Sequence, residues 1–129
     1  FVKIAQLEIQ RGHDEAIVYV ARGKSYIERQ QWIEALTDFS TAIERDSKSF
    51  AAYHNRGVVN IKRGVLNEAL ADFDKAIELK ADFADAYFGR GDVLRKLGDN
   101  AKAIANFKKA LEIDPRHNEA AAALKALGG

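Results

Sequence analysis

Apolar side chains recur at helical spacing along this chain, and the whole arrangement of apolar and polar positions returns every 34 residues. Tyr19, Tyr53 and Tyr87 mark the interval, and an Arg-Gly pair begins three positions after each tyrosine. A repeat of this length indicates copies of one helical unit, each of which buries its apolar face against its neighbours. The pattern therefore predicts a repeat architecture.

The first half of each unit has the pattern of an amphipathic helix. Counting from Ala16 as position 1, the aromatic at position 4, the glycine at position 8 and the residue at position 11 share one helix face. Gly64 and Gly98 at position 15 end the helical pattern, because glycine accepts the left-handed conformation after a helix. The first unit has Gln30 at this position, and we expect this departure to cost little stability.

The second half of each unit carries a small residue, a phenylalanine and a small residue at spacings of four and three. This spacing places the three side chains on one face of a second helix. Small residues allow two helices to approach closely, and the phenylalanine fills the space between them. Each unit is thus predicted to be an antiparallel helical hairpin, with the sets Ala35, Phe39 and Ala42; Ala69, Phe73 and Ala76; and Ala103, Phe107 and Ala110.

The motifs Tyr-x-x-Arg-Gly and Ala-x-x-x-Phe-x-x-Ala occur three times in the same register. In this the chain resembles the tetratricopeptide repeat family, whose unit is a 34-residue helical hairpin. The resemblance covers residues 16–117. It implies an all-α fold, a right-handed α-solenoid of three tetratricopeptide hairpins followed by a capping helix. The expected repeats are residues 16–49, 50–83 and 84–117, and Pro115 closes the third because proline disfavours helix in the residue before it.

The two ends of the chain fall outside the three repeats. Residues 118–129 are predicted to form a capping helix and tail, because the last repeat would otherwise expose its apolar flank. Residues 1–15 are interpreted as a flanking helix or as the remnant of a preceding repeat that ends at Gly12. An apolar alternation through Val2 and Ile4 leaves a strand as the alternative.

Composition narrows the class of protein. The 129 residues are 47% hydrophobic and 30% charged, which is typical of a soluble folded domain, and the net charge of +1 is far from that of a dedicated nucleic-acid binder. No apolar stretch reaches the roughly 18 residues of a membrane span. The absence of cysteine does not decide the compartment, and we favour the cytoplasm. Because the chain opens at Phe1 without methionine, we expect it to be part of a longer protein.

The sequence offers little material for catalysis. His13, His54 and His117 lie far apart and form no triad pattern. The runs that begin at His13 and His117 look like helix starts, with Asp14 and Asn118 as N-caps. Without cysteine, a metal-binding spacing or a glycine-rich phosphate loop, we expect no enzyme, no metal site and no cofactor.

The face of each first helix that points away from the core is the candidate functional surface. In a stacked solenoid these faces align into one groove. We expect its apolar side chains to face solvent and so to mark a binding surface, the alternative being that the array's curvature or residues 1–12 cover them. The first helices are the more basic, which would suit an acidic segment of a partner, and an ordinary solvated mixture of charges is the equally weighted alternative. The candidate groove residues are Val20, Lys24, Ile27, His54, Asn55, Val58, Ile61, Phe88, Asp92 and Arg95.

Arginine recurs at position 7 of every unit, beside the predicted core. An arginine stem can cover apolar surface while the guanidinium hydrogen-bonds an acceptor. We expect a structural role for these arginines, and the candidate pairs are Arg22 with Asp38, Arg56 with Asp72 and Arg90 with Asn106.

The resemblance also allows a test for one known ligand class. Some members of the family bind the C-terminal carboxylate of chaperones through a clamp of lysine, asparagine and arginine on three first helices. At the matching positions only Asn55 agrees, whereas Val20, Lys24, Asp85 and Gly89 differ. Asp85 stands where a cation is required, so recognition of chaperone tails by that clamp is not expected.

Together these features predict a non-enzymatic interaction module that binds a peptide or a segment of a partner protein in the groove. The alternative hypothesis is a self-association or spacer module within a larger protein, which would use Phe1, Ile4 and Leu7. Neither hypothesis involves nucleic acid or membrane insertion.

Overall fold

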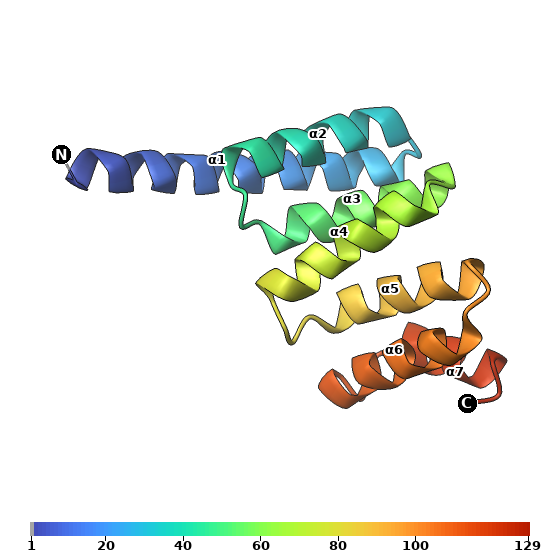
Figure 1. The fold of residues 1–129 in the computed structure, drawn as a ribbon. Coiled ribbons are helices and arrows are strands. Elements are labelled where there is room, and N and C mark those ends of the chain that lie inside the picture. The colour runs from blue at the N-terminus through green and yellow to red at the C-terminus, as the bar shows by residue number, and fades with distance from the viewer. Residues whose placement is uncertain (1) are drawn as a thin grey trace.

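The computed structural model describes residues 2–129, and within this range the chain forms seven helices and no strand (Figure 1). This arrangement confirms the prediction of an all-α solenoid. Residue Phe1 lies outside the described range. The helices are α1 (Val2–Glu28), α2 (Trp32–Arg45), α3 (Phe50–Arg63), α4 (Leu66–Leu79), α5 (Ala84–Lys96), α6 (Asn100–Ile113) and α7 (Asn118–Ala126).

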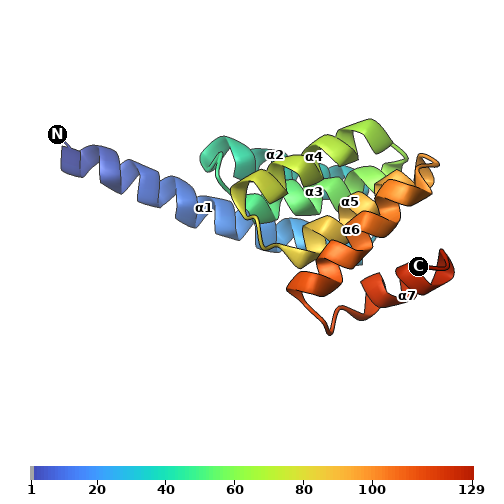
Figure 2. The same ribbon diagram turned by 60° about the horizontal axis from the view of Figure 1, so that its bottom comes forward.

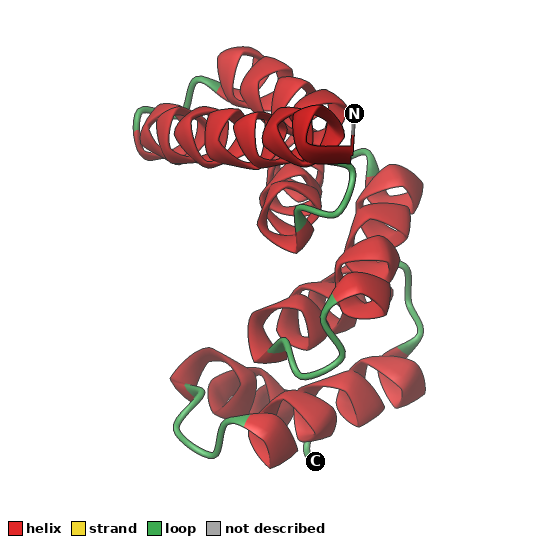
Figure 3. Ribbon diagram, turned by 90° about the vertical axis from the view of Figure 1, so that its left-hand side faces the viewer, coloured by secondary structure: helices red, strands yellow, loops and turns green. Residues whose placement is uncertain are grey.

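The helices pair into three hairpins, α1 with α2, α3 with α4 and α5 with α6, and α7 packs on α6. Helix α3 also contacts α1 and α5, while no comparable contact within residues 2–129 joins α2 to α4 or α4 to α6. The first helices of the hairpins therefore form the inner side of the array. Figures 2 and 3 show the hairpins following one another along an arc, with a concave side lined by these helices.

A glycine and a phenylalanine define the core of each hairpin. Phe73 is completely buried, and a Cβ atom placed on Gly57 would lie 2.9 Å from its ring. Carbon atoms do not approach so closely, so only glycine allows the ring to pack directly on the backbone of the first helix. The same contact occurs in all three hairpins, between Gly23 and Phe39, Gly57 and Phe73, and Gly91 and Phe107.

The recurring arginines join the two helices of each hairpin, as predicted. Nη2 of Arg56 donates to Oδ1 of the buried Asp72 at 2.8 Å, and the side chain of Asn60 donates to Oδ2 at 3.0 Å. These bonds compensate the desolvation of the carboxylate. The equivalent bonds are Arg22 to Asp38 at 2.7 Å and Arg90 to Asn106 at 2.8 Å.

The turn inside each hairpin uses the same left-handed backbone. Gly64 and Gly98 have φ angles of 77° and 90°, and Gln30 adopts a φ of 59° at the equivalent position. The first hairpin therefore makes its turn without glycine. The ends of the hairpins are also alike, since Asp46, Lys80 and Asp114 are all extended although only the last precedes a proline.

The N-terminal segment is helical, but the predicted end at Gly12 and the alternative strand are both wrong. Helix α1 continues without a break from Val2 to Glu28. The backbone of Gly12 lies against the carbonyl of Arg45, so this glycine permits close packing rather than ending a helix. The N-terminal end of α1 projects away from the array in Figures 1 and 2, and it does not fold back over the groove.

Both predicted N-caps are also wrong. Asp14 lies inside α1, where its carboxylate accepts a hydrogen bond from Gln10 one turn earlier at 3.0 Å. The N-cap of α7 is His117 and not Asn118, because the ring Nδ1 of His117 accepts the backbone N–H of Ala120 at 3.1 Å. A histidine can replace the usual capping oxygen when its Nδ1 is unprotonated.

The turn at Gln30 gives a first prediction. Gln30→Gly should stabilise the array by about 0.5–1 kcal/mol, since glycine relieves the left-handed strain but adds entropy to the unfolded chain. Urea unfolding followed by circular dichroism measures the change. Gly64→Gln is the matched reverse substitution, because no atom lies within 4 Å of its Cβ position, and it should lose a similar free energy. An unchanged midpoint for Gln30→Gly would contradict the role assigned to the turn.

Candidate functional site

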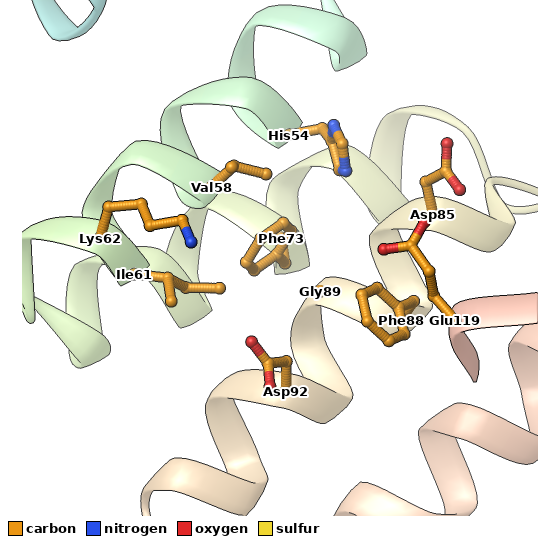
Figure 4. Close-up of a pocket in the computed structure, with 10 residues that line it drawn as sticks. All are labelled: His54, Val58, Ile61, Lys62, Phe73, Asp85, Phe88, Gly89, Asp92 and Glu119. Atoms are coloured by element: carbon orange, nitrogen blue, oxygen red, sulfur yellow. The ribbon is translucent and has the colours of Figure 1, made fainter. Parts of the chain in front are cut away.

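A pocket of about 440 Å³ opens between α3 and α5 on the concave side of the array (Figure 4). We call it the α3–α5 pocket. Val58 and Ile61 come from α3 and Phe88 from α5, so three apolar candidate residues meet in one place. The pocket is lined by His54, Val58, Ile61, Lys62, Phe73, Asp85, Phe88, Gly89, Asp92 and Glu119.

The other half of the predicted groove lies outside this pocket. Val20 and Ile27 pack against the buried residues of the first two hairpins. Asn55 uses its amide to donate to the carbonyl of Ala51 at 2.8 Å, and Arg95 forms an ion pair with Asp92 at 2.7 Å. Lys24 is exposed on α1 and does not line the pocket.

The expectation that the apolar groove residues face solvent is wrong. All five are partly buried, because they pack against core residues of the hairpins or, for Phe88, against the rings of Phe107 and His117. Val58 and Ile61 pack at the edge of the core that contains Phe73. They therefore contribute both to the stability of the second hairpin and to the wall of the pocket. The five residues are Val20, Ile27, Val58, Ile61 and Phe88.

The floor of the pocket depends on a second glycine contact. The ring of Phe73 meets Gly57 within its own hairpin and also Gly89 on α5, where a Cβ atom would collide with the ring. The pocket therefore lies where one buried ring contacts both neighbouring first helices. Phe73 was predicted only as a residue of the hairpin core, and Gly89 was not among the predicted site residues.

Glu119 was also missed, although the repeat register contained a signal for it. Residue 118 continues the numbering of a first helix as position 1, which makes Glu119 position 2 of the capping helix. Position 2 belongs to the groove face in the other units. The capping helix therefore contributes to the site as well as covering the last hairpin.

His54 is held between aromatic rings at one side of the pocket. Its ring lies 4.9 Å from that of Phe83 and 5.6 Å from that of Phe73, measured between centroids. This burial lowers the pKa of His54 to about 4, although the charge of Asp85 acts in the opposite direction. His54 is therefore neutral at physiological pH.

Asp85 is connected to the capping helix by a histidine. Nε2 of His117 lies 2.8 Å from Oδ1 of Asp85, while Nδ1 of His117 accepts the N–H of Ala120. An imidazole that accepts at Nδ1 and donates at Nε2 is in its neutral form. The contact positions α7, and with it Glu119, at the edge of the pocket.

The charge of the pocket differs from the prediction of a basic groove. Its lining contains three carboxylates, those of Asp85, Asp92 and Glu119, and one ammonium group, that of Lys62. The prediction failed because it counted charges over whole helices, whereas Lys24 and Arg95 are not part of the lining. The α3–α5 pocket is acidic with an apolar floor.

Two other kinds of site receive no support from the described residues. Residues 2–129 contain no group of three histidine or acidic side chains arranged to hold a metal ion. No helix in this range has the length and hydropathy that would let it cross a membrane.

Comparison with family models gives two matches. Residues 84–117 match the model for the tetratricopeptide repeat, and residues 59–98 match a model described as TPR repeat. The first of these ranges coincides with the third unit expected from the sequence. A comparison with curated proteins gives no match.

Solved structures with a similar fold include TPR domains. The first TPR of Spaghetti (RPAP3) bound to the HSP90 peptide SRMEEVD is 22% identical, with a TM-score of 0.86 over 90% of this chain and 92% of that chain. The Arabidopsis OM64 TPR domain is 25% identical, with a TM-score of 0.85 over 90% and 96%. YrrB, described as a TPR protein with an unusual peptide-binding site, is 26% identical, with a TM-score of 0.79 over 86% and 57%.

The depressed pKa of His54 gives a second prediction. The pKa of His54 is 6.5 in the unfolded chain and about 4 in the folded protein, so between these two pH values only the unfolded chain binds the proton. The free energy of unfolding therefore falls as the pH drops through this window. The wild type should lose about 2 kcal/mol more than His54→Asn between pH 7 and pH 4. Urea unfolding at each pH measures the difference. An NMR titration midpoint of the His54 ring near 6.5 would contradict this account.

Proposed function

We propose that this chain, which matches tetratricopeptide repeat models over residues 59–98 and 84–117, is a non-enzymatic interaction module that binds a peptide or partner segment in the α3–α5 pocket. The observation that carries the proposal is the meeting of Val58, Ile61 and Phe88 in one open pocket on the concave side. Half-exposed apolar side chains with polar groups around them are typical of sites that bind another chain.

The rigidity of the walls supports this function. The arginine at position 7 of each hairpin and the phenylalanine between its helices fix α3 and α5 before any partner arrives. A preformed pocket loses little conformational entropy when it is filled, so a larger part of the contact energy appears as affinity. The mechanism is the burial of an apolar side chain of the partner over Phe73 and Phe88, with Asp92 and His54 fixing its register.

Solved TPR domains of similar fold bind chaperone peptides, but the charge of the α3–α5 pocket opposes a ligand of that kind. The peptide in the Spaghetti complex, SRMEEVD, is rich in acidic residues. In this chain Asp85 and Glu119 line the pocket and would repel an acidic segment. We therefore do not extend the chaperone partners of those relatives to this protein.

The proposal predicts the effect of removing the apolar walls. Ile61→Ala combined with Phe88→Ala should weaken peptide binding by at least about tenfold, because both side chains contact the occupant. Peptides selected from a random library on the wild type provide the ligands, and titration calorimetry measures their affinity. Circular dichroism should show that helicity is kept.

The matched control removes two half-buried aliphatic groups outside the pocket, with Ile77→Ala and Leu111→Ala. This variant should bind the selected peptides as the wild type does. Binding that survives the loss of Ile61 and Phe88, or that falls equally in the control, would show that the pocket is not the binding site.

Self-association is a second candidate function, and the projecting end of α1 favours it. Ile4, Leu7 and Ile9 are 62%, 61% and 73% exposed, because α1 begins well before the part that packs on α2. Exposed apolar residues at the end of an array provide a surface on which another copy can stack.

This alternative makes its own prediction. Light scattering should give a mass above 14.3 kDa that rises with protein concentration, and Leu7→Gln should return the mass to that of a monomer. Ala21→Gln, an exposed position on the same helix, is the control and should leave the association unchanged. A monomeric mass at every concentration contradicts self-association.

A further inference from the structure

The proposed function leaves the chemistry of the occupant open, and the distribution of charge around the α3–α5 pocket narrows it. In Figure 4 the carboxylates of Asp85 and Glu119 lie at one end of the pocket, beyond Phe88, and Lys62 lies at the other end. The side chain of Asp85 is 62% exposed, so its carboxylate is accessible from the pocket mouth.

Neither of these two carboxylates is neutralised by the protein. His117 donates to Asp85 as a neutral imidazole, because its Nδ1 is occupied by the N–H of Ala120. Glu119 forms no ion pair with any residue of the range 2–129. Asp92 differs, since its Oδ1 accepts from Arg95 at 2.7 Å. Two negative charges therefore remain at one end of the pocket.

These charges can persist in the empty pocket because of where they lie on their helices. Asp85 and Glu119 each occupy the second residue of a helix, α5 and α7 respectively. The N-terminus of a helix stabilises a carboxylate without removing its net charge. Negative charge at the mouth of a pocket with an apolar floor attracts a cation more strongly than the same charge on an open surface.

We infer that the α3–α5 pocket binds a basic and apolar segment of a partner protein, in which a lysine or arginine stands next to an aliphatic or aromatic residue. The cationic head group lies between Asp85 and Glu119, and its aliphatic stem lies on the ring of Phe88. The neighbouring apolar side chain covers Phe73 between Val58 and Ile61. The inference rests on the proposed function and specifies its ligand.

The size of the pocket agrees with this occupant. A volume of about 440 Å³ holds one large side chain together with the stem of another, and not a whole folded element. Lys62 at the opposite end attracts an acidic or polar group of the same segment, which would fix the direction in which the segment crosses α3 and α5.

The test begins with a random peptide library selected on the intact protein. The selected peptides should be enriched in a lysine or arginine beside an apolar residue. A fluorescein-labelled peptide from this set should bind Asp85→Asn combined with Glu119→Gln about tenfold more weakly than the wild type, and the wild-type affinity should fall with added salt. Asparagine at position 85 keeps an oxygen for His117, and circular dichroism checks that α7 remains folded.

Two controls make the result specific. Glu44→Gln removes an exposed negative charge on α2, far from the pocket, and should leave the affinity unchanged. A peptide in which the basic residue is replaced by glutamate should bind Glu119→Lys more tightly than it binds the wild type.

The outcomes separate this inference from the proposed function. Peptides that lose affinity in the Ile61 and Phe88 variant but carry no basic residue, or that are acidic, overturn the inference and leave the proposed function standing. The same holds if neutralising Asp85 and Glu119 has no effect on affinity. A library that yields no peptide dependent on Ile61 and Phe88 overturns both.

Discussion

The contact between a glycine and a phenylalanine ring sets the geometry on which the rest of the structure depends. Because position 8 carries no side chain, each phenylalanine packs directly on the backbone of its partner helix and fixes the separation of the hairpin. Phe73 alone of the three also meets a glycine of the next hairpin, Gly89, since the equivalent residues of α3 and α7 are Asn55 and Ala123. The α3–α5 pocket lies at this doubled contact, so the packing that stabilises the array also positions its candidate site.

The features that occur three times could be predicted from the sequence, and the features that occur once could not. Spacing alone gave the hairpins, the arginine bonds between helices and half of the pocket lining. It failed at Gly12, where a glycine inside a helix looks the same in sequence as one that ends it. It also failed at His117, because a ring nitrogen serves as the N-cap in place of the usual side-chain oxygen. Gly12 packs against Arg45, and the ring of His117 also contacts Asp85 through Nε2; such tertiary contacts are not visible in the 34-residue period.

Electrostatics was the least predictable property of the site, for a related reason. Summing charges over helix faces ignores which side chains are already paired and which elements close the groove. Arg95 is bound by Asp92, and Glu119 enters from the capping helix, so the balance at the pocket changes from basic to acidic. Burial then keeps His54 neutral, and the capping contact does the same for His117. The charge of the pocket is a property of the folded array and not of any one repeat.

The separation of floor and rim explains how one fold serves different partners. The floor residues are required by packing, since a larger residue at Gly89 would displace the ring of Phe73. The rim residues Asp85, Glu119 and Lys62 are exposed and can differ between proteins at little cost in stability. Shape is therefore expected to be common to arrays of this type, while the rim charges decide which segment binds. A likeness of fold accordingly supports a binding function for this chain, and the chemistry of its ligand has to be derived from its own rim.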